Sequence, residues 1–371
     1  MNVTIDGAID GTRARLERIG RAELADDIAA GRATAAGVDG SLGSGRIWPS
    51  SDVDLTVVPA DGPDWGVEWL VRDGVVIHKH INGWGLLNRL QQEYPHSFIE
   101  GAAEDWIRDP TWLLDGLASI RPVYDPAGKL SRLREFMLAH RFRPEVIEPR
   151  RVLLLQRASD RSSKAQAAFN HDDKSEGEWQ IAMALEALAL IWVEAAGRII
   201  SLKELDPELK SACEDLDAPD AHHLFRAAAG LTGLESHLPA IDGALAALDD
   251  LYSPWVDHAL AEPGPDDGRV KLWRARIAYR RHQIHSARCA IPRDCWLHLA
   301  TVRKDIESLP VDLDQARGDL ANAAAPAPEL DRPALQQRCE AVIDAFPLNP
   351  ARDRIAALRA LQVHTVQRLN D

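Results

Sequence analysis

Patterns typical of β-strands are confined to the first 124 residues of the 371-residue chain. The strongest is a hairpin, in which VEWLVR (67–72) and VVIHKHI (75–81) are separated only by Asp73-Gly74. Asp-Gly favours a two-residue turn because both positions can adopt positive φ. The turn fixes the register of the two strands and places His78 opposite Trp69. Further strands are predicted by short apolar, β-branched runs at 37–42, 53–58 and 119–124.

From about residue 129 onward only helical periodicity remains. Together with an amphipathic helix over 8–30 ahead of the strands, helices are predicted over 84–93, 104–116, 129–140, 145–170, 177–197, 201–217, 221–231, 237–263, 267–290, 294–308, 333–345 and 350–369. We therefore expect an α+β protein in which a small mixed-sheet domain (1–142) is followed by a large all-helical region. That region divides into a helical domain (143–320) and a C-terminal helical extension (321–371), with the Ala/Pro-rich stretch 322–333 as the linker.

Composition and charge narrow the class of protein. The chain has 46% hydrophobic and 27% charged residues, and no apolar run is long enough to cross a bilayer. Its N-terminus lacks the basic-then-apolar order of a signal peptide, and we expect no membrane partner. Its four cysteines form no CxxC pair, which favours free thiols in a reducing cytoplasm. A net charge of −14 disfavours general nucleic-acid binding and favours cationic partners. The oligomeric state is left open, with a homodimer as one option.

Two aspartates mark the start of the 53–58 strand. Asp52 and Asp54 are two positions apart, so both side chains project from the same face of a sheet. Adjacent carboxylates repel each other unless a cation lies between them, and Mg²⁺ is the hard cation that such ligands prefer. The pair Gly40-Ser41 and a glycine-containing loop come just before, where backbone N–H groups and a hydroxyl can hold phosphate oxygens. Carboxylates beside a phosphate cradle suit phosphoryl or nucleotidyl transfer.

This stretch resembles the signature of the DNA polymerase beta-like nucleotidyltransferase superfamily. That signature has a Gly-Ser pair, a glycine six positions into the loop counted from the first Gly, and Ser-Asp-x-Asp at the start of a strand. The matching residues are Gly40, Ser41, Gly45, Ser51, Asp52 and Asp54. The resemblance implies that Asp52 and Asp54 hold Mg²⁺, and that Gly40, Ser41 and Ser51 contact the nucleotide.

Two more segments are similar to the small-molecule branch, which includes aminoglycoside and lincosamide nucleotidyltransferases. One is RPVYDPAGKLSRL (121–133), and the other is the helical stretch 176–205, in which the branch's lysine falls on Lys203 as a phosphate contact. Together the similarities cover about residues 30 to 215. They imply transfer of an NMP, with ATP the expected NTP, to a hydroxyl of a small molecule. The acidic net charge favours a cationic acceptor such as an aminoglycoside.

The chain departs from the family at the third carboxylate, which commonly lies on the neighbouring strand. Here that strand is VVIHKHI and contains no acid. His78 or His80 has a pKa suited to proton abstraction near neutrality, and we assign His78 as the catalytic base. In some related enzymes the base comes from the helical domain, which leaves Glu176 or Glu178 as alternatives.

Two other functions remain open. Transfer to a macromolecule such as a tRNA end or a protein, as in toxin–antitoxin nucleotidyltransferases, needs a basic track. The 269–288 helix, with Arg274 and Arg280, is the only candidate. His282 and His285 on that helix have no carboxylate motif near them in the sequence, which makes them weak metal ligands. The missing third acid also leaves room for a nucleotide-binding pseudoenzyme.

Overall fold

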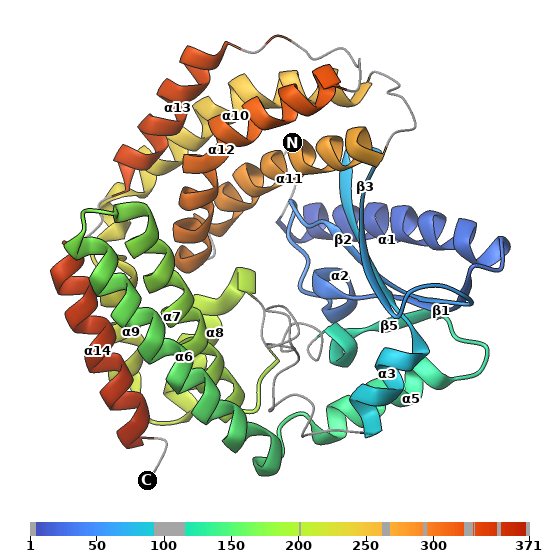
Figure 1. Cartoon of the computed structure of the whole chain (residues 1–371), viewed down its shortest axis with the longest axis horizontal. Coiled ribbons are helices and arrows are strands. Elements are labelled where there is room, and N and C mark those ends of the chain that lie inside the picture. The colour runs from blue at the N-terminus through green and yellow to red at the C-terminus, as the bar shows by residue number, and fades with distance from the viewer. Residues whose placement is uncertain are drawn as a thin grey trace. The chain divides into compact units, whose positions relative to one another are not determined.

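The computed structural model describes residues 5–92, 116–199, 202–261, 268–291, 295–322, 329, 331–346 and 350–368. A five-stranded mixed sheet from the N-terminal part and helices in the rest confirm the predicted α+β class (Figure 1). The predicted helix 104–116 lies outside these residues except at its last position, and so do residues 323–328 and 330 of the predicted linker 322–333. Among the described helices, none combines the length and the apolar character that crossing a bilayer requires.

The chain divides into two compact units, each assembled from separate stretches of sequence. Unit 1 comprises Met1–Ala139, Gly243–Cys289 and Lys304–Ile343, whereas unit 2 comprises His140–Asp242, Ala290–Arg303 and Asp344–Asp371. The first boundary lies near the predicted one at 142. The predicted segments 143–320 and 321–371 differ from the structure, because each contributes to both units. Amphipathic periodicity shows which face of a helix is buried and does not show against which partner.

Unit 1 contains the sheet, the helices that follow its strands, and the greater part of four later helices. Its elements are α1 (Ile5–Ala29), β1 (Ala33–Val38), α2 (Gly40–Ser44), β2 (Val53–Pro59), β3 (Trp65–Arg72), β4 (Val75–Asn82), α3 (Trp84–Gln92), β5 (Arg121–Tyr124), α5 (Lys129–His140), α10 (Leu238–Ala261), α11 (Gly268–Ala290), α12 (Trp296–Asn322) and α13 (Arg332–Ala345).

The sheet has the order β3-β4-β2-β1-β5, with β2 and β4 parallel and the other pairs antiparallel. Helix α1 covers one face, where Leu16, Ile19 and Leu24 are buried in one cluster with Val53 and Leu55 of β2. Side chains alternate along a strand, so the residues of β2 between these apolar positions project from the opposite face. This places the polar residues of β2 away from the α1 core.

The β3–β4 hairpin forms with the predicted register. Asp73 and Gly74 have φ values of 52° and 72°, as a type I′ turn requires, and Trp69 pairs with His78. The turn and the alternating pattern act over a few residues, which is why the sequence alone predicted this register.

The predicted strand 37–42 is wrong at its C-terminal end. Strand β1 stops at Val38, and Gly40–Ser44 forms the short helix α2. Gly40 has a φ of +56°, which takes the chain out of the extended conformation. The Gly-Ser pair therefore begins a helical turn and does not end a strand.

Helix α12 is longer than the predicted 294–308, because it continues through Pro310 to Asn322. Proline usually ends a helix, since it lacks an N–H donor. Here Leu309 and Leu313 are buried on both sides of it. Tertiary packing thus outweighs the local break.

Unit 2 is helical throughout its described residues, as predicted. It contains α6 (Pro144–Asn170), α7 (Lys174–Ala195), the 3₁₀ helix η2 (Leu202–Glu204), α8 (Leu205–Asp215), α9 (Pro219–Ala229), the 3₁₀ helix η3 (Leu234–His237) and α14 (Ala351–Arg368). Glu194, in the last turn of α7, is buried against Arg141 and Arg150. Arg354 of α14 binds Glu178 of α7 and the carbonyl oxygen of Ala228 in α9, which ties three helices together.

Candidate metal and nucleotide site

The two aspartates at the start of β2 lie beside a histidine of β4. The parallel register pairs Asp54 with His78, and His78 Nδ1 is 3.3 Å from Asp54 Oδ1 and 3.8 Å from Asp52 Oδ2. One ligand atom from each of the three residues lies within 4.8 Å of the others. Two carboxylates and an imidazole at this spacing can bind a divalent cation. The structure thus brings together three residues that the sequence had singled out.

A third carboxylate lies next to this group, and sequence reasoning missed it. Asp39 directly follows β1, and its backbone N–H donates to the Asp54 carbonyl oxygen at 3.0 Å. Its side chain is buried and accepts a 2.5 Å hydrogen bond from the hydroxyl of Thr56. Burial and then the neighbouring Asp54 charge raise the pKa of Asp39 to about 8. A third carboxylate thus lies at the end of β1, on the side of β2 opposite β4.

The signal for Asp39 is its place directly before Gly40-Ser41 in GVDGS. Using that signal requires knowing that β1 lies beside β2 with Val38 opposite Leu55. Strand order depends on contacts between distant parts of a chain, so the motif alone did not reveal this neighbour.

Without metal, we expect the free energy of unfolding to fall as the pH rises from about 4 to about 8. Over that window the unfolded chain has released the Asp39 proton while the folded protein retains it, so the folded state binds more protons. Asp39→Asn keeps an oxygen for Thr56 and removes the titration. Chemical denaturation in EDTA should show a flatter pH dependence for this variant, and equal slopes for wild type and variant would contradict the assignment.

The Gly40-Ser41 turn packs closely against the carboxylate of Asp54. A Cβ atom at Gly40 would lie 1.9 Å from Asp54 Oδ2, so only glycine fits there. The Ser41 hydroxyl is buried and has no hydrogen-bond partner among the described residues. An unpartnered buried hydroxyl is costly, and a phosphate oxygen would satisfy it.

Ser51, predicted to contact the nucleotide, has a structural role in the loop. Its hydroxyl accepts a hydrogen bond from the Trp48 backbone N–H at 2.9 Å, and its own N–H donates to the Trp48 carbonyl oxygen. These two bonds close the turn that leads into Asp52.

Helix α11 brings further aromatic and imidazole groups to the carboxylates. His282 Nε2 lies 3.8 Å from Asp52 Oδ2, and the Tyr279 ring stacks on the His282 ring with centroids 5.9 Å apart. Trp69 packs on His78 at 4.0 Å between centroids. Burial and the Asp52 charge raise the pKa of the Tyr279 hydroxyl to about 12, so it stays a neutral donor.

His282 and His285, which have no carboxylate motif near them in the sequence, each lie beside a carboxylate in the structure. His282 lies beside Asp52, and His285 Nε2 is 2.7 Å from Asp249 Oδ1. Asp52 and His282 are far apart in the sequence, and only the packing of α11 near the sheet joins them.

The remaining candidates are divided between the two units. Lys203 (in η2), Glu176 and Glu178 belong to unit 2, where Glu178 is paired with the buried Arg354. His80 is on β4, and burial lowers its pKa.

Arg280 of α11 is engaged within unit 1. It forms ion pairs with Asp305 and Asp312, which neutralise the charge that a basic track for a polyanion would need.

Comparisons with known proteins include a distant structural likeness. The chain matches no known protein family, and no curated protein matches it. Among solved structures it is similar to a nucleotidyltransferase-like protein from Exiguobacterium sibiricum 255-15, with 13% sequence identity and a TM-score of 0.33. That likeness covers 83% of this chain and 92% of the other.

Proposed function

We propose that the protein is a Mg²⁺-dependent nucleotidyltransferase that moves an NMP from an NTP, with ATP expected, to a hydroxyl of a small molecule. The observation that carries this proposal is the group Asp52, Asp54 and His78 directly beside the Gly40-Ser41 turn. Two carboxylates that can bind a cation lie next to the buried Ser41 hydroxyl. This hydroxyl has no hydrogen-bond partner among the described residues, so it can donate to a phosphate oxygen.

Each residue of this group has a distinct task in the proposed reaction. Asp52 and Asp54 would hold the cation, and His78, whose Nδ1 faces both carboxylates, would complete the donor set. When bound, Mg²⁺ neutralises the triphosphate and lowers the pKa of the attacking hydroxyl. The Ser41 hydroxyl would donate to a phosphate oxygen.

Asp39 is better suited than His78 to accept the proton of the attacking hydroxyl. Burial and the neighbouring Asp54 charge raise the pKa of Asp39, so its carboxylate holds a proton more readily than an exposed aspartate does. His78 Nδ1 is already directed at the two carboxylates. We therefore assign proton acceptance to Asp39, in place of the sequence-based choice of His78.

Binding of each of the four NTPs, with and without Mg²⁺, to wild type and Asp54→Asn tests the proposal. We expect Mg²⁺ to raise the affinity for one NTP by at least about tenfold in wild type and to have no effect in the variant. Asp61→Asn removes the same charge at an exposed position of unit 1 and should behave like wild type. Failure of every NTP to bind, or unchanged metal dependence in Asp54→Asn, would overturn the proposal.

A further inference from the structure

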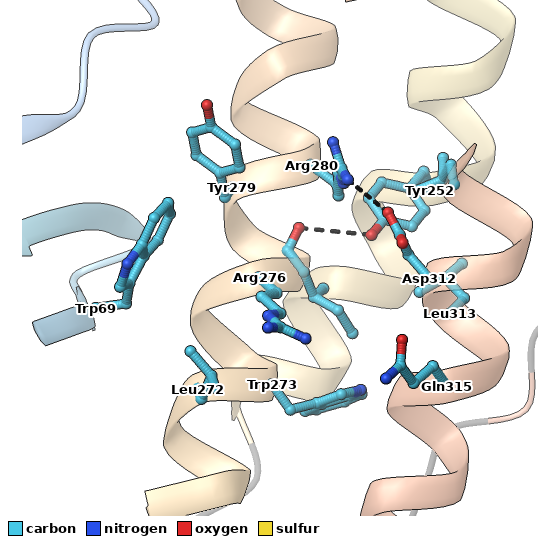
Figure 2. Close-up of a pocket in the computed structure, with 12 residues that line it drawn as sticks. Trp69, Tyr252, Leu272, Trp273, Arg276, Tyr279, Arg280, Asp312, Leu313 and Gln315 are labelled. Atoms are coloured by element: carbon cyan, nitrogen blue, oxygen red, sulfur yellow. Dashed lines mark hydrogen bonds and ion pairs between the residues drawn. The ribbon is translucent and has the colours of Figure 1, made fainter. Parts of the chain in front are cut away.

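A pocket of about 380 Å³ lies between strand β3 and helices α10, α11 and α12 of unit 1 (Figure 2). This volume is within the range of small-molecule sites, which is about 300–1,000 Å³. Much of its lining is aromatic or aliphatic: Trp69, Tyr252, Leu272, Trp273, Ile277, Tyr279, Leu309 and Leu313. Flat aromatic walls favour a ligand with a flat apolar body.

One of the charged residues that line the pocket has no acidic partner among the described residues. Arg280 pairs with Asp312, with Nη2 and Oδ2 2.5 Å apart, and also with Asp305. Arg276 also lines the pocket, and it forms no hydrogen bond or ion pair with the described residues. Figure 2 shows its guanidinium group between Trp273 and Arg280. A guanidinium in this position is a ready partner for a carboxylate.

A second donor points to the same chemistry. Trp273 is 5% exposed, and its indole Nε1 is buried with no hydrogen-bond partner among the described residues. In Figure 2 that nitrogen lies at the end of the ring directed toward Gln315. A buried N–H without an acceptor costs about 1–3 kcal/mol, so an acceptor group on a ligand would be favoured here.

We propose that this pocket binds a small organic carboxylate with a flat apolar body, whose carboxylate takes Arg276 and whose polar edge reaches Trp273 Nε1. A single unpaired arginine suits a monoanion better than a phosphate dianion. Trp69 and Tyr279 line the pocket and also pack on the rings of His78 and His282, so the ligand would lie next to the metal group. The pocket's residues alone support this inference, which stands apart from nucleotidyl transfer.

The local charge of this pocket is opposite to what the net charge of the chain favours. A net charge of −14 attracts cations in general. Arg276 has no acidic partner among the described residues, so the pocket itself selects an anion.

Calorimetric titration with 6-hydroxynaphthalene-2-carboxylate and with its neutral counterpart 6-hydroxynaphthalene-2-carboxamide tests the proposal. The hydroxyl oxygen at the far edge of the ring supplies the acceptor for Trp273 Nε1. We expect saturable binding with a preference of about tenfold for the carboxylate, because a charge-assisted hydrogen bond is stronger than a neutral one. Arg276→Gln should abolish the preference and still bind both probes. Trp273→Phe, which keeps a smaller aromatic ring and removes the N–H, should weaken both probes by about threefold to tenfold.

Arg274→Gln is the matched control, since it removes the same charge from the same helix at a residue that does not line the pocket. It should keep the preference, and thermal unfolding should show that all three variants are folded. The proposal is overturned by absence of saturable binding to wild type, by an intact preference in Arg276→Gln, or by equal losses in Arg276→Gln and Arg274→Gln. These outcomes involve neither NTP nor Mg²⁺, so they are separate from the test of nucleotidyl transfer.

Discussion

Gly40→Ala is expected to displace the Asp54 carboxylate and to lower the affinity for Mg²⁺ or Mn²⁺ by at least about tenfold. The added Cβ atom would lie 1.9 Å from Asp54 Oδ2 and 2.8 Å from its Cγ, far inside any allowed contact. Either the carboxylate or the α2 turn must move. Because Ser41 is the next residue, the same movement shifts its hydroxyl away from the proposed phosphate position.

Gly45→Ala separates this collision from backbone strain. Gly45 also has a positive φ, +81° against +56° for Gly40, but a Cβ atom there meets nothing within 4 Å. Both variants should lose about 1–2 kcal/mol of stability because an L-residue is strained at positive φ. Only Gly40→Ala should lose metal affinity. Calorimetric Mn²⁺ titration without nucleotide measures this, and equal affinities in the two variants would show that the contact with Asp54 does not support the metal site.

Glu194→Gln is expected to destabilise the protein by about 3–5 kcal/mol, through unit 2. The Glu194 side chain is 1% exposed, and Arg141 and Arg150 that contact it are 0% and 5% exposed. The Arg150 contact, from Nη2 to Oε1, is 3.0 Å. The substitution removes the negative charge that two buried guanidinium groups contact.

Glu145→Gln is the control for this second prediction. Glu145 lies in unit 2, and its 3.8 Å ion pair with Arg143 joins two side chains that are more than half exposed. Exposed pairs contribute little, so its change should stay within about 1 kcal/mol. Urea denaturation followed by circular dichroism gives both values. Equal shifts for the two variants would mean that the buried group does not hold unit 2 together.

The sequence by itself determined the local features of this protein. The Asp73-Gly74 turn and the alternation of apolar residues set the hairpin register, and the two-residue spacing of Asp52 and Asp54 placed both on one face. Helical periodicity located the described helices, apart from the short helix α2 and the end of α12. These features depend on hydrogen bonds and side-chain directions within a few residues, which a sequence displays directly.

Only the tertiary structure decided which distant residues meet. It placed Asp39 of the β1 end against Asp54, brought His282 and Tyr279 of α11 to the carboxylates, and formed the pocket around Arg276. Strand order and helix packing follow from burying apolar surfaces of segments far apart in the chain, and a helix with one apolar face can bury it against many partners. Local periodicity therefore predicted two of the three carboxylates, whereas the packing of β1 beside β2 supplied the third.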